Sequence, residues 1–146
     1  MPLSFNKNPD SHIGKILPGH IALIPDGNRR WARGQGFNPW KGHEVGFHRF
    51  REVADAAFEA GIPHVTIWAA SEDNLTKRNP LEVRFLLSIL YRELKKELSA
   101  DGFLGGRTRV RFIGRWNQLL KKIKRLEELV ARVEAKTKDA AERTLT

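Results

Sequence analysis

Six consecutive residues that follow a short apolar run carry the side chains expected of a diphosphate-binding site. The run is HIALIP at residues 20–25, and the six residues are Asp26, Gly27, Asn28, Arg29, Arg30 and Trp31. A carboxylate can hold Mg²⁺ together with phosphate oxygens, and paired Arg side chains and loop amides can neutralise the remaining negative charge. A polar turn between a strand and a helix would use the same residue types, with Gly27 at a positive φ. The residues alone leave both interpretations open.

Two further segments have polar side chains that could join such a site. Ser71, Glu72, Asp73 and Asn74 follow a second apolar run, HVTIWAA at residues 64–70, and His43 lies at the start of a stretch with helical periodicity. Taken alone, the first segment is typical of an Asx-rich turn, and His43 is typical of a surface residue near a helix N-terminus. A function for either segment therefore depends on where the fold places it.

The elements that must position these residues alternate between strand and helix. We predict strands at residues 20–25, 64–70 and 109–113. Helices are predicted over residues 42–60 and 80–98 and along an apolar seam formed by Leu119, Ile123, Leu126, Val130 and Val133. This βαβαβα order indicates an α/β fold with a parallel β-sheet and helices on its faces. Ligands bind beyond the carboxyl ends of parallel strands, and both Asp26 and Ser71 fall there.

The helix over residues 80–98 has a well-marked start. Asn79 is predicted as its N-cap, Pro80 as its first residue and Glu82 as its third, which together approach a capping box. Gly61 is predicted to end the preceding helix. The apolar faces of the two helices include Phe50, Ala54, Val83, Leu87 and Leu90. Periodicity shows only that these residues are buried, in a packed core or beside a tunnel for an apolar ligand.

Size and composition indicate a soluble cytoplasmic protein. The chain has 146 residues and no Cys, its first residues lack the apolar core of a signal peptide, and no apolar run approaches the length of a membrane span. We predict a flexible N-terminal arm at residues 1–19 and a single domain at residues 20–146.

The net charge of +9 predicts contact with polyanions. Residues 102–126 contain eight basic and no acidic side chains, namely Arg107, Arg109, Arg111, Arg115, Lys121, Lys122, Lys124 and Arg125. A solvated strand edge and helix face explains them, and a surface facing anionic lipid, with peripheral membrane contact, is the alternative. Few aromatic residues interleave the basic ones, so no nucleic-acid partner is predicted.

Three blocks, taken in order, resemble the cis-prenyltransferases, the undecaprenyl diphosphate synthase family. They are HIALIPDGNRRWAR at residues 20–33, GHEVGF at 42–47 and SEDNLTKR at 71–78. The resemblance implies Mg²⁺-dependent prenyl transfer, in which isopentenyl diphosphate condenses onto an allylic prenyl diphosphate with a new cis double bond. The product is a polyprenyl diphosphate, used in the biosynthesis of lipid carriers. The family also implies a homodimer.

The resemblance assigns roles to individual residues. Asp26 matches the acidic residue of the first motif, which makes it the Mg²⁺ ligand and a catalytic residue. The residues implied to bind substrate are Gly27, Asn28, Arg29, Arg30, Trp31, His43, Ser71, Glu72, Asp73 and Arg78. Asn74 is implied to act catalytically when the isopentenyl unit loses a proton. Because a neutral amide is a weak base, we expect Asn74 to orient a water or a diphosphate oxygen.

The resemblance covers residues 17–146, which correspond to the amino-terminal part of a family member. The later part of the family supplies an Arg-x-Ser block for isopentenyl diphosphate, a second acidic metal ligand, further strands and most of the dimer interface. We therefore expect this chain to be truncated, to have little or no synthase activity alone, and to leave an unpaired edge on its last strand. The alternative is a non-catalytic subunit that binds a prenyl diphosphate and needs a partner chain.

Overall fold

A four-stranded parallel sheet forms the centre of the fold. The computed structural model describes residues 16–99, 106–117 and 123–146. Its strands are β1 (His20–Leu23), β2 (His64–Ile67), β3 (Thr108–Val110) and β4 (Arg143–Leu145), in the order β1-β2-β4-β3. Every neighbouring pair in this order is parallel. The predicted fold class, α/β with a parallel sheet and helices, is confirmed.

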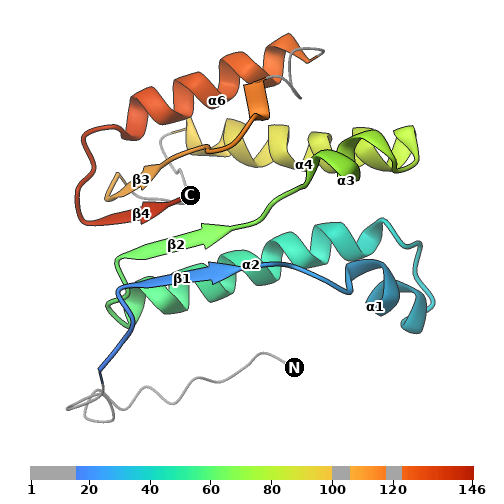
Figure 1. Cartoon of the computed structure of the whole chain (residues 1–146), viewed down its shortest axis with the longest axis horizontal. Helices are drawn as coiled ribbons and strands as arrows, with labels where there is room; N and C mark the ends of the chain where they lie inside the picture. The colour runs from blue at the N-terminus through green and yellow to red at the C-terminus, as the bar shows by residue number, and fades with distance from the viewer. Residues whose placement is uncertain (1–15, 100–105, 118–122) are drawn as a thin grey trace.

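Helices lie along the sheet and beyond the carboxyl ends of its strands (Figure 1). They are α1 (Asn28–Gly34), α2 (Lys41–Glu59), α3 (Glu72–Thr76), α4 (Pro80–Glu97) and α6 (Lys124–Thr137). Asn79 is the N-cap of α4, as predicted, because its side-chain oxygen accepts a hydrogen bond from the Leu81 amide at 2.8 Å. Gly61, with a φ of +93°, follows the end of α2, which also agrees with the prediction.

Two hydrophobic clusters form where the apolar faces of the long helices meet the sheet. The first joins α2 to β1 and β2, and its buried members are Phe50, Ala54, Ala57, Phe58, Ile62 and Val65. The second joins α4 and α6 to β3, and its buried members are Leu94, Val110, Leu126, Leu129, Val130 and Val133. Leu145 of β4 packs against both clusters. The central position of β4 in the sheet therefore lets one side chain connect the two halves of the core.

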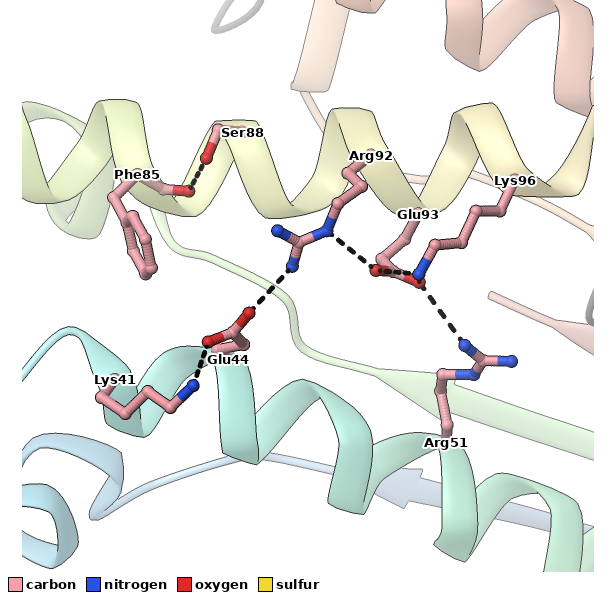
Figure 2. Close-up of polar contacts among 8 residues, drawn as sticks. All are labelled: Lys41, Glu44, Arg51, Phe85, Ser88, Arg92, Glu93 and Lys96. Carbon is pink, nitrogen blue, oxygen red and sulfur yellow. Dashed lines mark hydrogen bonds and ion pairs between the residues drawn. The ribbon is translucent and has the colours of Figure 1, made fainter.

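A second connection between the halves is polar and runs from α2 to α4. Figure 2 shows Glu44 of α2 between Lys41 and Arg92, and Glu93 of α4 next to Arg51 of α2. The N···O distances across the two helices are 3.4 Å for Arg92–Glu44 and 3.5 Å for Arg51–Glu93. Ion pairs thus join the two helices beside the apolar clusters.

The strands are shorter than the apolar runs predict. β2 ends at Ile67 rather than at residue 70, and Trp68 beyond it is exposed. β3 ends at Val110 rather than at residue 113, because the Phe112 amide donates to the Glu134 carboxylate at 2.7 Å and the chain turns toward α6. β3 forms one edge of the sheet, as expected for the last predicted strand, and β4 pairs with its inner side.

Three elements were not predicted as such, namely α1, α3 and β4. The first two are short helices in segments interpreted as turns, and the third is built from the ERTLT segment. The apolar seam at Leu126, Val130 and Val133 is confirmed by its burial in α6, whereas Leu119 and most of the predicted N-terminal arm fall outside the described residues. Within the described ranges, we find no helix with the length and apolar character needed to cross a bilayer.

Candidate functional site

Asn28 anchors the first motif on α2. Gly42 and Gly46 lie one turn apart on α2, and a Cβ added at Gly42 would lie 2.0 Å from the Asn28 carbonyl oxygen. A Cβ at Gly46 would lie 2.6 Å from the Asn28 side-chain oxygen. The absence of side chains at both positions therefore lets the backbone of α1 approach α2 closely. This contact explains why the GHEVG segment carries glycines, and it fixes the position of the residues around Asn28.

Gly27 shapes the turn that precedes α1. Its φ of +86° lies in the left-handed region, which side chains with a Cβ adopt only with strain. The Gly27 amide donates to Asp26 Oδ1 at 2.6 Å, and Arg30 donates to Asp26 Oδ2 at 2.8 Å. The Asp26 side chain remains 84% exposed. The first motif thus presents a carboxylate to solvent, with a guanidinium directly beside it.

A small polar pocket of about 100 Å³ lies at this turn. Its lining residues are Pro25, Asp26, Gly27, Asn28, Arg29, Arg30, His43 and Arg78. The lining of this space therefore includes three guanidiniums and an imidazole but only one carboxylate. Arg side chains present forked N–H donors that suit phosphate oxygens, so the pocket has the chemistry to bind a compact polyanion such as a diphosphate.

One acidic residue behind the pocket connects several of these cations. Glu82, in the first turn of α4, is 4% exposed, and its carboxylate lies 2.9 Å from His43 Nε2. Arg29 and Arg78 lie 3.6 and 3.5 Å from the same carboxylate. From the sequence, Glu82 is predicted as part of a helix cap and not as a site residue. Its position four residues after Arg78 is a sequence signal for the pairing of these two residues.

The second motif lies at the same edge of the sheet but outside the lining of this pocket. Ser71 caps α3, because its Oγ accepts from the Asn74 amide at 3.1 Å. Glu72 pairs with Arg115 at 2.6 Å, and Asp73 pairs with Lys77 at 2.9 Å. The structure therefore brings together Asp26, Gly27, Asn28, Arg29, Arg30, His43 and Arg78. It does not bring Ser71, Glu72, Asp73 or Asn74 to the same pocket.

A largely apolar groove of about 470 Å³ lies next to the polar pocket, and the two share Pro25, Asp26 and Asn28. Its remaining lining residues are Leu23, Ile24, Trp31, Gly42, Val45, Gly46, Arg49, Phe50 and Val53. Trp31, predicted as a substrate contact, thus lines the groove rather than the polar pocket. Of the helix-face residues named as candidates for a tunnel, Phe50 alone belongs to this lining.

The residues at the pocket suit a metal ion that arrives with its ligand. Among the described residues, no three His, Cys, Asp or Glu side chains are grouped so that they could hold a metal ion. Asp26 nevertheless lines the pocket with an exposed carboxylate, whose oxygens keep free lone pairs beside the hydrogen bonds that they accept. Mg²⁺ is commonly held by one or two carboxylates together with substrate phosphates. A lone Asp26 beside an anion pocket fits that mode of binding.

The sequence is similar to enzymes of prenyl metabolism. A family model described as "Putative undecaprenyl diphosphate synthase" matches residues 24–146. An isoprenyl transferase of Thermus thermophilus is 43% identical over 115 residues, covering 76% of this chain and 43% of the relative. Dehydrodolichyl diphosphate synthase 2 of Arabidopsis thaliana is 34% identical over 118 residues, covering 81% of this chain and 37% of the relative. The chain thus spans less than half the length of these relatives.

A solved structure has the same fold. Lavandulyl diphosphate synthase from Lavandula x intermedia, in complex with dimethylallyl diphosphate, superposes with a TM-score of 0.74 at 26% sequence identity. The match covers 88% of this chain and 52% of that structure. Fold and sequence therefore agree, and the chain belongs to the undecaprenyl diphosphate synthase family of cis-prenyltransferases.

Proposed function

We propose that the pocket at Asp26 binds the diphosphate of an allylic prenyl substrate. In this proposal the chain carries the allylic half of a Mg²⁺-dependent cis-prenyltransferase, which condenses isopentenyl diphosphate onto that substrate to make a polyprenyl diphosphate. The observation that carries the proposal is the convergence of Arg29, Arg30, His43 and Arg78 on one pocket, next to an apolar groove that shares Pro25, Asp26 and Asn28 with it. The pocket would suit the anionic diphosphate of such a substrate, and the groove would suit its apolar prenyl chain.

The chain's own residues would act mainly on the leaving group. When the carbon–oxygen bond of the allylic diphosphate breaks and the new carbon–carbon bond forms, negative charge develops on the diphosphate. Arg29, Arg30 and Arg78 line the pocket and supply fixed positive charge and N–H donors for it. Asp26 would hold Mg²⁺, which adds positive charge at the same oxygens. The role of Asn74 in the loss of the proton stays a prediction.

The same diphosphate site also supports a second form of the proposal. The chain spans 43% of the Thermus thermophilus relative and 52% of the lavandulyl diphosphate synthase structure. In this form the protein is a subunit that binds a prenyl diphosphate and needs a partner chain for turnover. In both forms of the proposal the diphosphate site is the same.

Calorimetric titration of the chain with farnesyl diphosphate, with and without Mg²⁺, tests the diphosphate site. We expect binding that Mg²⁺ strengthens, and we expect Asp26→Asn to lose most of the gain from Mg²⁺. Glu52→Gln is the matched control, because Glu52 also forms an exposed ion pair with an Arg, at 2.6 Å. If the wild-type chain binds farnesyl diphosphate no better with Mg²⁺ than without, the metal role of Asp26 is wrong. If it does not bind at all, the proposed site is wrong.

A separate assay distinguishes the enzyme from the binding subunit. Incorporation of radiolabelled isopentenyl diphosphate into polyprenyl products is measured with the chain alone. Tight binding of farnesyl diphosphate without incorporation supports a subunit that needs a partner. Incorporation at ordinary enzyme rates would overturn the expectation that the chain alone has little or no synthase activity.

A further inference from the structure

A single buried carboxylate lies close to basic side chains from three segments of the candidate site. The Glu82 side chain is 5% exposed and lies 2.9 Å from His43 of α2, 3.6 Å from Arg29 of α1 and 3.5 Å from Arg78, which precedes α4. All of these partners line the polar pocket, whereas Glu82 does not. Glu82 therefore lies behind the pocket and contacts the groups that form its walls.

This arrangement leaves donors of the partners available to a ligand. A guanidinium has five N–H donors, and the contacts of Arg29 and Arg78 with Glu82 each involve only the Nη1 end of the guanidinium. The Arg29 side chain is 46% exposed and the Arg78 side chain 25% exposed, so both still reach solvent at the pocket. A carboxylate removed from water is stable only when it is well paired, which favours keeping the three partners close together.

Resting on the function proposed above, we propose that Glu82 is a positioning residue of the diphosphate site. It holds Arg29, His43 and Arg78 in one arrangement, so that the donors not used by Glu82 converge on the same diphosphate. Because Glu82 belongs to α4, it also links the start of that helix to α1 and α2 at the pocket. Positioning of this kind reduces the ordering that a ligand must otherwise impose on long side chains.

The proposal and simple electrostatics predict effects of opposite sign. Glu82 is an anion close to an anion-binding pocket, so by Coulomb's law alone its neutralisation should strengthen the binding of a diphosphate. If Glu82 acts by positioning its partners, its neutralisation should weaken binding, because Arg29 and Arg78 lose their common anchor. The sign of the change in affinity therefore separates the two roles.

The experiment is a calorimetric titration of the full chain with inorganic pyrophosphate, in the presence and absence of Mg²⁺. Glu82→Gln has nearly the same shape as the wild-type side chain and is equally suited to the third position of a helix. We expect it to bind pyrophosphate roughly ten-fold more weakly, the lower end of the loss seen when orienting partners are removed from metal sites. Glu82→Asp keeps the charge but withdraws it by one methylene, so we expect an intermediate affinity.

Glu93→Gln is the matched control. Glu93 is another buried carboxylate of α4, 6% exposed, with basic partners on α4 and α2, and it is not part of the pocket lining. We expect Glu93→Gln to lower the melting temperature about as much as Glu82→Gln does, with no change in pyrophosphate affinity. This control separates a loss of positioning from a general loss of stability.

The possible outcomes are distinct. If folded Glu82→Gln binds pyrophosphate as tightly as the wild type, or more tightly, the positioning role is wrong. If Glu82→Gln does not fold, Glu82→Asp decides the question, and wild-type affinity in that variant overturns the proposal. If the wild-type chain does not bind pyrophosphate at all, the proposed diphosphate site fails, and the positioning role falls with it.

Discussion

Arg92 of α4 donates to the Glu44 carboxylate of α2 across 3.4 Å (Figure 2). Lys41 approaches the same carboxylate at 2.6 Å, and the rings of Trp40 and Phe85 lie 6.0 Å apart near the same end of the two helices. Because the pocket uses residues that precede or begin α2 and α4, a fixed spacing of these helices also fixes the walls of the site. The Arg92–Glu44 pair, whose Glu44 directly follows the pocket residue His43, therefore bears on binding as well as on stability.

The stability of the protein should depend on the charge of Glu93. Burial raises the pKa of Glu93, but the hydrogen bonds and charges of Lys96, Arg92 and Arg51 outweigh burial and hold the pKa below its usual value of 4.5. A carboxyl group with a lowered pKa in the folded state stabilises the fold above its unfolded pKa, and this contribution is lost as the pH falls through the folded pKa. The wild-type protein should therefore become less stable below about pH 4.5.

The contribution of the Glu93 carboxylate to stability can be measured by replacing it with an amide. We expect Glu93→Gln to lower the free energy of unfolding at pH 7 by about 3 kcal/mol, because Arg51 and its neighbours lose a buried partner. The difference from the wild type should narrow as the pH falls through and below 4.5. Urea unfolding followed by circular dichroism at pH 7 and pH 3.5 measures it. If the two proteins differ in the free energy of unfolding by the same amount at both pH values, the charge of Glu93 is not what stabilises the fold.

Asp55 should have the opposite effect on stability. Burial raises the pKa of Asp55 above its usual value of 3.8, although Arg51 and Arg143 act against burial. A raised pKa means that the charged form is disfavoured by folding, so this cost is present above the folded pKa and disappears below about pH 3.8. We expect Asp55→Asn to stabilise the protein at pH 7, by less than about 1 kcal/mol because water still screens a half-buried charge. Thermal unfolding at pH 7 that gives a lower melting temperature for Asp55→Asn would refute this.

Local sequence rules were sufficient for the long helices and for three of the strands, and insufficient for α1, α3 and β4. The end of α2 and the start of α4 were predictable because an apolar stripe of helical period meets strong boundary signals there, namely Gly61 after α2 and Asn79 with Pro80 at α4. The strand β4 has three residues and depends on pairing with distant segments, as between Leu145 and Val110. Such pairing has no signature within a window of a few residues.

The site was predictable as a set of residue types, but its organisation was not. Asp26 to Arg30 is a continuous segment, and the resemblance to a family added His43 and Arg78 from other blocks. The acidic residue that connects them, Glu82, looks in the sequence like an ordinary residue at the start of a helix. Its burial follows from the way α1, α2 and α4 meet, which is a property of the tertiary fold.

The contact between Gly42 and Asn28 should be essential for the first motif. A Cβ at Gly42 would overlap the Asn28 backbone, which cannot move without shifting the turn at Asp26. We expect Gly42→Ala to lower the free energy of unfolding by about 2 kcal/mol, as overpacked sites do, and to weaken the binding of pyrophosphate. Gly34→Ala is the control, since a Cβ at Gly34, also in a helix, meets no atom within 4 Å. It should be neutral or stabilising, by up to about 1 kcal/mol.

Leu145 should determine whether the two hydrophobic clusters unfold together. It packs against both clusters from the central strand β4, so Leu145→Ala removes an apolar contact from each at once. We expect a loss of about 2 kcal/mol in the free energy of unfolding, at the low end for Leu because the side chain is only partly buried. Cooperativity should also fall, so that urea transitions followed by Trp fluorescence and by circular dichroism no longer coincide.

Leu98→Ala is the control, because Leu98 packs against the α4–α6 cluster and not against the cluster of α2, β1 and β2. Coincident transitions in Leu145→Ala, with a stability loss no larger than in Leu98→Ala, would show that β4 does not couple the two halves through this side chain.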